Sequence, residues 1–65
     1  MQIYLNQQLQ DVQSQTISLM LQELGIQSTG IAIAVNNQVI PRSQWEAFLL
    51  AEGDKITIIR ATQGG

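Results

Sequence analysis

The chain has 65 residues, a net charge of −2 and an isoelectric point near 4.5. This length supports one small domain, which buries only about 60% of its unfolded surface. Its three scattered basic residues argue against nucleic acid binding, and the absence of cysteine and histidine removes thiol chemistry and the commonest general base and metal ligand.

The first residues predict a strand hairpin. Ile3 and Leu5 alternate with polar neighbours, which is the period of a half-buried strand. Residues 6–8 are typical of a turn, and a second, less regular strand is expected over residues 9–13. The short connection favours antiparallel pairing of the two strands.

A helix is predicted to follow, beginning after Thr16. The hydroxyl of Thr16 can accept a hydrogen bond from the first free N–H groups of the helix. Four apolar residues then recur at helical spacing and form one stripe suited to a core: Ile17, Met20, Leu21 and Leu24. Gly25 suits the position after the helix, where φ is positive.

The middle of the chain predicts a second hairpin and a long connection. Strands are expected over residues 31–35 and 38–40, joined by an Asn36-Asn37 turn, because asparagine tolerates the left-handed region. Pro41 ends the second of these strands, since it has no N–H for the ladder. Residues 43–46 predict a single helical turn. Four large apolar residues of this connection are expected to bury part of their area: Trp45, Phe48, Leu49 and Leu50.

The last strand is the most apolar and is predicted over residues 55–61, after a Gly53-Asp54 turn. Ile56 and Ile58 are expected to face the helix. Alternation then places Thr57 and Ile59 on the opposite face, where an exposed isoleucine suits a partner surface. A small satellite contact within the domain is the alternative, since single exposed apolar residues are common.

The order of elements predicts an α+β fold with a mixed sheet of four to five strands and one main helix packed on one face. The last strand suits the centre of the sheet, parallel to the first strand. This arrangement is the β-grasp, or ubiquitin-like, fold. Residues 1–61 are expected to form a single β-grasp domain, followed by a flexible tail at residues 62–65.

The tail ends in Gly64 and Gly65 and has no large apolar side chain to bury. Without Cβ atoms, two glycines can thread a narrow channel, and backbone N–H donors can capture the terminal carboxylate. The tail is therefore interpreted as the reactive part of the protein, with the Gly65 carboxylate as its useful group. A frayed end without function is the alternative.

Several motifs in this order resemble those of the small sulfur carrier proteins of thiamine biosynthesis, the ThiS family. They are the Ala/Ile strand with its Asn turn, the Ile40-Pro41-Arg42-Ser43-Gln44-Trp45 segment, the Gly53-Asp54 turn and the terminal Gly64-Gly65. The resemblance covers essentially the whole chain.

The resemblance implies a mechanism that involves several partners. An adenylating, E1-like enzyme would consume ATP to convert the Gly65 carboxylate to an acyl-adenylate. Sulfur from a cysteine desulfurase persulfide would then give a thiocarboxylate, which donates sulfur to thiazole synthase. The chain itself would be a protein co-substrate with no bound cofactor or metal and no catalytic residue. The residues expected to meet partners are Ile59, Arg60, Ala61, Thr62, Gln63 and Gly64, with Gly65 as the modified residue.

Three other functions remain open from the sequence. The small subunit of molybdopterin synthase has the same fold and tail but delivers sulfur to a pterin. A ubiquitin-type modifier would end in an isopeptide bond at Gly65. A docking module would use the domain and not the tail.

The remaining features indicate structure more than chemistry. The five carboxylates show no clustered spacing and are interpreted as solvated charges or turn residues: Asp11, Glu23, Glu46, Glu52 and Asp54. Arg60 is interpreted as a solvated charge that could also pair with an acidic partner site, and Arg42 as a surface residue. The apolar runs are far shorter than a membrane span and no signal peptide is evident, so a cytoplasmic protein without membrane contact is expected.

Overall fold

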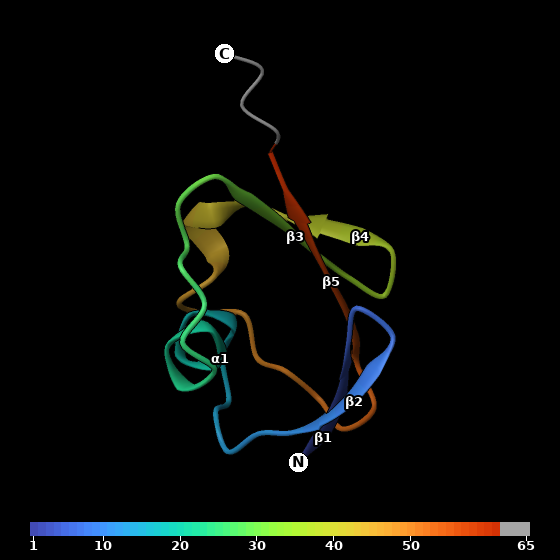
Figure 1. Ribbon diagram of the computed structural model, residues 1–65. Coiled ribbons are helices and arrows are strands. Elements are labelled where there is room, and N and C mark those ends of the chain that lie inside the picture. The colour runs from blue at the N-terminus through green and yellow to red at the C-terminus, as the bar shows by residue number, and fades with distance from the viewer. Residues whose placement is uncertain (62–65) are drawn as a thin grey trace.

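The computed structural model describes residues 1–61 as a five-stranded sheet with one α-helix on one face (Figure 1). The strands are β1 (Gln2–Leu5), β2 (Gln8–Asp11), β3 (Ile31–Val35), β4 (Gln38–Ile40) and β5 (Lys55–Arg60). Helix α1 spans Ile17–Glu23, and a 3-10 turn, η1, spans Arg42–Gln44. The predicted α+β architecture is confirmed.

Strand β5 lies at the centre of the sheet, whose order is β2-β1-β5-β3-β4. It pairs with β1 in parallel, with Leu5 opposite Ile56, and with β3 in antiparallel, with Ile33 opposite Ile58. The predicted central position and parallel pairing are both confirmed. The last strand is therefore held from both sides where it begins. It ends at the edge of the molecule opposite the N-terminus (Figure 1).

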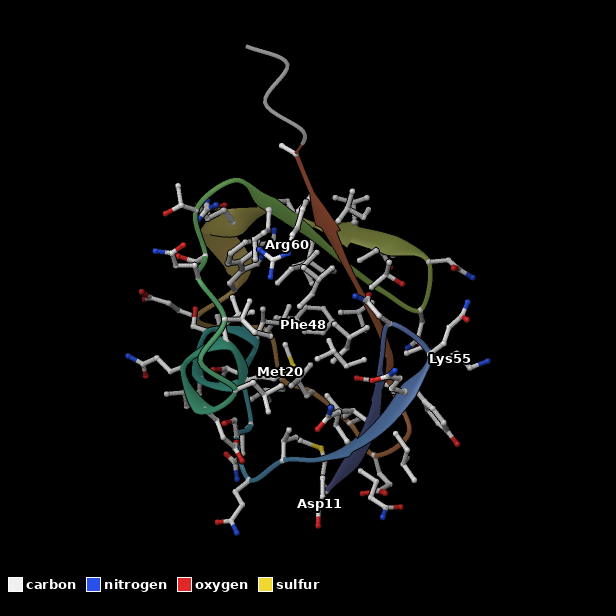
Figure 2. The ribbon with its side chains drawn as sticks, in the orientation of Figure 1. Asp11, Met20, Phe48, Lys55 and Arg60 are labelled. Carbon is white, nitrogen blue, oxygen red and sulfur yellow. The ribbon has the colours of Figure 1, made fainter. Side chains whose placement is uncertain are left out.

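The helix forms where the apolar stripe was predicted. The Thr16 hydroxyl accepts a hydrogen bond from the Leu19 N–H at 3.2 Å, and Gly25 ends the helix with φ of +69°. Ile17, Met20 and Leu21 are buried. Figure 2 shows Met20 and Phe48 between the helix and the sheet, and Phe48 packs on the core as expected.

The connection between β4 and β5 is held by Trp45, which is 4% exposed. Its indole N–H donates to the Ile40 carbonyl at 2.9 Å, so its polar atom is satisfied inside the core. The Arg42 guanidinium lies 4.6 Å from the centre of the indole ring and donates to the Ser28 carbonyl at 2.6 Å. Arg42 is a surface residue, as predicted, and it also ties η1 to the loop before β3.

The prediction for Leu49 was wrong, because its side chain is 70% exposed. This segment is extended, and Leu49 forms an isolated antiparallel bridge with Thr16. Side chains of extended backbone alternate, so Phe48 and Leu50 turn inward and Leu49 turns outward.

The bounds of three elements differ from those predicted, and β2 begins at Gln8 rather than at residue 9. β2 ends at Asp11 rather than at residue 13, because the N–H groups of Gln13 and Ser14 donate to the Glu23 carboxylate. η1 begins one residue before the predicted helical turn and ends two residues earlier. β5 ends at Arg60 rather than at residue 61.

Both hairpins turn through residues with positive φ. Asn36 and Asn37 have φ of 51° and 69°, and Asn6 and Gln7 have φ of 48° and 71°. Two consecutive positive values are typical of the type I′ turn that matches strand twist. Asn6 also accepts a hydrogen bond on Oδ1 from the Ile58 N–H at 2.8 Å, which joins the first hairpin to β5.

Asn6 therefore yields a paired prediction for stability. Asn6→Ala is expected to lower the free energy of unfolding by about 2 kcal/mol. The variant loses this hydrogen bond, and it places in the left-handed region an alanine, whose side chain cannot form the local hydrogen bonds that asparagine forms there. Asn6→Gly loses only the hydrogen bond and is expected to cost about 1 kcal/mol. Urea unfolding of both variants measures the difference, and equal losses would contradict the turn argument.

Three carboxylates accept hydrogen bonds from the backbone. Glu52 binds the Gln2 N–H, Asp54 binds the Ala51 N–H, and Glu23 binds the Gln13 and Ser14 N–H groups together with the Ser14 hydroxyl. The Ser14 hydroxyl, followed by the Gln13 N–H, holds the pKa of Glu23 below its ordinary value of 4.5.

This shift sets an expected pH dependence. A carboxylate with a lowered pKa in the folded state stabilises the fold above its unfolded pKa, and this stability is lost as pH falls through the folded value. Glu23→Gln is expected to reduce the loss of stability as pH is lowered from 4.5 through the lower pKa of the folded state. Thermal unfolding across this range measures it. Glu46→Gln is the control, since the Glu46 carboxylate accepts no hydrogen bond from residues 1–61, and a flattened curve for both variants would contradict the assignment.

Candidate functional site

The candidate site begins where β5 leaves the sheet. Arg60 pairs with Ile31 of β3, and the Ala61 N–H donates to the Gly30 carbonyl at 2.8 Å. Gly30 has φ of +72°, a conformation that glycine adopts without strain. The chain is thus held by β3 up to Ala61, the last described residue, at one end of the molecule (Figure 1).

Three of the predicted partner-binding residues lie in the described part of the chain. Ile59, Arg60 and Ala61 are consecutive and all exposed. The others, Thr62, Gln63, Gly64 and the modified Gly65, lie outside the described residues, and so does the predicted flexibility of the tail.

Ile59 belongs to the sheet face that α1 does not cover. Its side chain is 50% exposed, which confirms the predicted alternation. Three more large apolar side chains are exposed on the same face, and together they form what we call the open-face patch: Tyr4, Leu9, Val39 and Ile59.

The strand register places the four side chains of the open-face patch on one face of the sheet. Tyr4 lies directly opposite Leu9 in the β1–β2 pair, and Val39 lies opposite Ala34 in the β3–β4 pair. Ala32 lies opposite Ile59. Ala32 and Ala34 of β3 have small side chains, so this part of the face projects little from the sheet. Exposed apolar surface of this kind marks sites of protein–protein interaction.

Of this patch, only Ile59 was predicted from the sequence. Period-two alternation in the first hairpin does place Tyr4 on the other face from Ile3 and Leu5. The same alternation places Val39 on the other face from Ile40. That signal was present for both residues. Leu9 could not be placed in this way, because the alternation in β2 is irregular.

Arg60 provides positive charge beside the chain exit. Its side chain lies on the helix side of β5, together with Ile56 and Ile58, and remains exposed (Figure 2). Within residues 1–61 the recorded ion pair joins the Met1 amino group to Asp11 at 3.5 Å, near the opposite end of the molecule. Arg60 is therefore available to an acidic group of a partner.

Several hollows mark the surface of the described residues, among them one of about 370 Å³ beside α1. Another, of about 360 Å³, lies on the open face beside the two hairpin turns and is lined in part by Tyr4, Gln7 and Thr57. A larger one, of about 810 Å³, lies between α1 and η1 and is not on the open face. Within residues 1–61 no group of three metal-binding side chains is found, and no helix is long and apolar enough to cross a membrane.

A mixed five-stranded sheet, one helix across one face and a chain end leaving from the central strand define a ubiquitin-like β-grasp protein. A sequence profile described as the ThiS family matches residues 2–65. The chain belongs to the ThiS family.

The similar proteins agree with this assignment. The sulfur carrier protein ThiS of Escherichia coli is 36% identical over 66 aligned residues, which cover all of both chains. A thiazole synthase from Paramagnetospirillum magneticum is 33% identical over 52 residues, which cover 80% of this chain but 16% of that protein. The crystal structure of a thiamine biosynthesis protein (ThiS) from Geobacter metallireducens superimposes with a TM-score of 0.87 over both full chains at 20% identity, which shows the same fold.

Proposed function

We propose that this protein is a sulfur carrier in thiamine biosynthesis and that it acts through the carboxylate of Gly65. The observation that carries the proposal is the full-length similarity to the E. coli sulfur carrier protein ThiS. The fold supports it, because β5 leads from the centre of the sheet to the C-terminal segment beside an exposed apolar patch.

The proposed chemistry takes place on Gly65 and uses enzymes supplied by partners. A carboxylate oxygen attacks the α-phosphorus of ATP in an adenylating enzyme, and pyrophosphate leaves. The outer sulfur of a desulfurase persulfide attacks the acyl-adenylate carbon, and AMP leaves. A thiol reductant then cleaves the S–S bond and releases the thiocarboxylate. Gly64 and Gly65 have no side chains, so the reacting carbon can pass through a narrow channel.

The domain contributes recognition in this proposal. The open-face patch buries apolar surface against the adenylating enzyme, and Arg60 meets an acidic group near the tail entrance. Ala61, Thr62, Gln63 and Gly64 span the distance from the domain to the reacting carbon. In this proposal the chain performs no catalytic step and holds no cofactor. ATP is used only by its partner, and the need for ATP favours a cytoplasmic location.

Thiazole synthase is the proposed acceptor of the sulfur. The matched segment makes up 16% of the P. magneticum thiazole synthase, so that protein contains a carrier-like segment within a longer chain. Two functions that share one polypeptide in a relative are expected to meet as separate proteins elsewhere. This favours a thiazole over a pterin as the product.

The intact mass of the protein tests the proposal. Incubation with ATP, a sulfur donor and an adenylating enzyme that loads the E. coli relative is expected to add about 16 Da, the difference between sulfur and oxygen. A variant that lacks Gly65 is expected to show no gain. An unchanged mass of the full chain would overturn the carrier function, and a gain equal to a second protein would indicate a modifier.

A further inference from the structure

Strand β5 has a neighbour along only part of one side. β1 pairs with it at two positions, Tyr4 with Lys55 and Leu5 with Ile56, and the Asn6 N–H then donates to the Ile56 carbonyl at 2.9 Å. At Asn6 and Gln7 the chain turns back into β2. Beyond this turn, the C-terminal half of β5 borders β3 on one side and no strand of residues 1–61 on the other (Figure 1).

The register identifies the backbone groups on this open edge. The Asn36 N–H donates to the Lys55 carbonyl, and the Ala61 N–H donates to the Gly30 carbonyl. Odd-numbered residues of β5 therefore direct their N–H and C=O groups toward β3, and even-numbered residues direct theirs toward β1. The peptide groups of Ile58 and Arg60 consequently face the side that β1 has left.

Asn6 closes the first position of that edge. Its Oδ1 accepts the hydrogen bond from the Ile58 N–H, in the place where a further β1 carbonyl would stand. The Ile58 carbonyl and the Arg60 N–H come next along the edge. Within residues 1–61 neither has a recorded hydrogen-bond partner, and an unpaired strand edge is a template for another extended chain.

We propose that an extended segment of thiazole synthase adds to β5 along this edge and continues the track of β1. The inference rests on the proposed function. The segment would accept from the Arg60 N–H and donate to the Ile58 carbonyl, and its side chains would lie beside Ile59 of the open-face patch. Recognition by strand addition takes its hydrogen bonds from the main chain and its specificity from alternate side chains.

Three observations favour thiazole synthase over a second copy of the chain. The free edge from Ile58 to Arg60 is about 10 Å long, which is far too short to hold a dimer by itself. Pairing this edge with itself would also bring two Arg60 side chains near one another without a recorded acidic partner within residues 1–61. In contrast, the P. magneticum thiazole synthase contains a carrier-like segment within its own chain.

Backbone N-methylation at Arg60 tests the proposal. The methyl group removes the donor and blocks the edge while the side chain is kept. The chain can be assembled by ligation at Ala51 through a temporary cysteine, and desulfurisation is selective because the natural sequence has no cysteine. Affinity for the cognate thiazole synthase is measured by calorimetry and is expected to fall about tenfold or more.

N-methylation at Asp11 is the matched control. The Val12 N–H donates to the Met1 carbonyl, so the β1–β2 register directs the Asp11 N–H away from β1, toward the outer edge of the sheet. Asp11 does not belong to the open-face patch, so this variant is expected to keep the wild-type affinity, and both variants are expected to keep the wild-type unfolding temperature. A loss of affinity at Asp11 but not at Arg60 would overturn the proposal.

Hydrogen exchange provides a direct readout. The Arg60 amide is expected to exchange rapidly in the free chain and at least about tenfold more slowly with thiazole synthase bound. Unchanged exchange together with unchanged affinity of the methylated chain would overturn the edge contact and leave the carrier function intact. A wild-type chain that does not bind the synthase would overturn the proposed partner. Methylation that changes only self-association in sedimentation would assign the edge to a second copy.

Discussion

Ile59→Glu is expected to lower kcat/KM for sulfur loading by about 100-fold without unfolding the domain. Ile59 is 50% exposed on the central strand β5, two residues before Ala61, where the chain leaves the sheet. In a complex that buries this face, the glutamate would lose its water without gaining a partner, which costs a few kcal/mol. Initial rates of mass gain at several carrier concentrations measure the effect.

Leu19→Glu is the control for this variant. Leu19 is 49% exposed, almost the same as Ile59, but it lies on α1, on the other side of the molecule. The Leu19→Glu variant introduces the same charge at nearly the same exposure, so its loading rate is expected to match that of the wild type. Equal losses for Leu19→Glu and Ile59→Glu would show that net charge, and not the open face, controls loading.

Ile33→Ala is expected to lower the free energy of unfolding by about 2–5 kcal/mol. Ile33 is fully buried on β3, with Ile58 on one side and Ile40 on the other, and it faces the helix. Truncation leaves a cavity where three strands meet. A domain of this size has only about 3–10 kcal/mol of stability in total, so a large share of it is lost.

Val39→Ala tests whether the loss arises from burial. Val39 lies on the neighbouring strand and is 63% exposed, so its truncation is expected to change stability by less than about 0.5 kcal/mol. Urea unfolding compares the two variants. A similar loss for both would contradict the assignment of the core face, and Val39→Ala is also expected to remain fully folded in the loading assay.

Local patterns determined the elements of this protein. The stripe from Ile17 to Leu24 predicted the helix, and the capping hydroxyl and final glycine act as expected at Thr16 and Gly25. These signals are reliable because side-chain direction and capping depend on residues only a few positions apart. The alternation of side chains along the last strand likewise placed Ile59 on the outer face without any knowledge of the strand order.

Alternation could not indicate the outward direction of Leu49. Its neighbours on both sides are also large and apolar, so hydrophobicity alone does not distinguish the inner face from the outer. The bridge between Leu49 and Thr16 decides the matter, and it joins segments that are far apart in the sequence. The role of Glu23 is similar, because its partners lie nine and ten residues away.

The sequence by itself determined a small α+β domain with a glycine tail, and the tertiary structure decided which surface accompanies that tail. Periodicity is local and says which side of its own strand a residue occupies. The open-face patch and the free Arg60 amide depend on register between distant strands, as the hydrogen bond between Asn6 and Ile58, 52 residues apart, illustrates. Register is set by packing of the whole core, so only the folded chain shows where β1 stops and β5 continues alone.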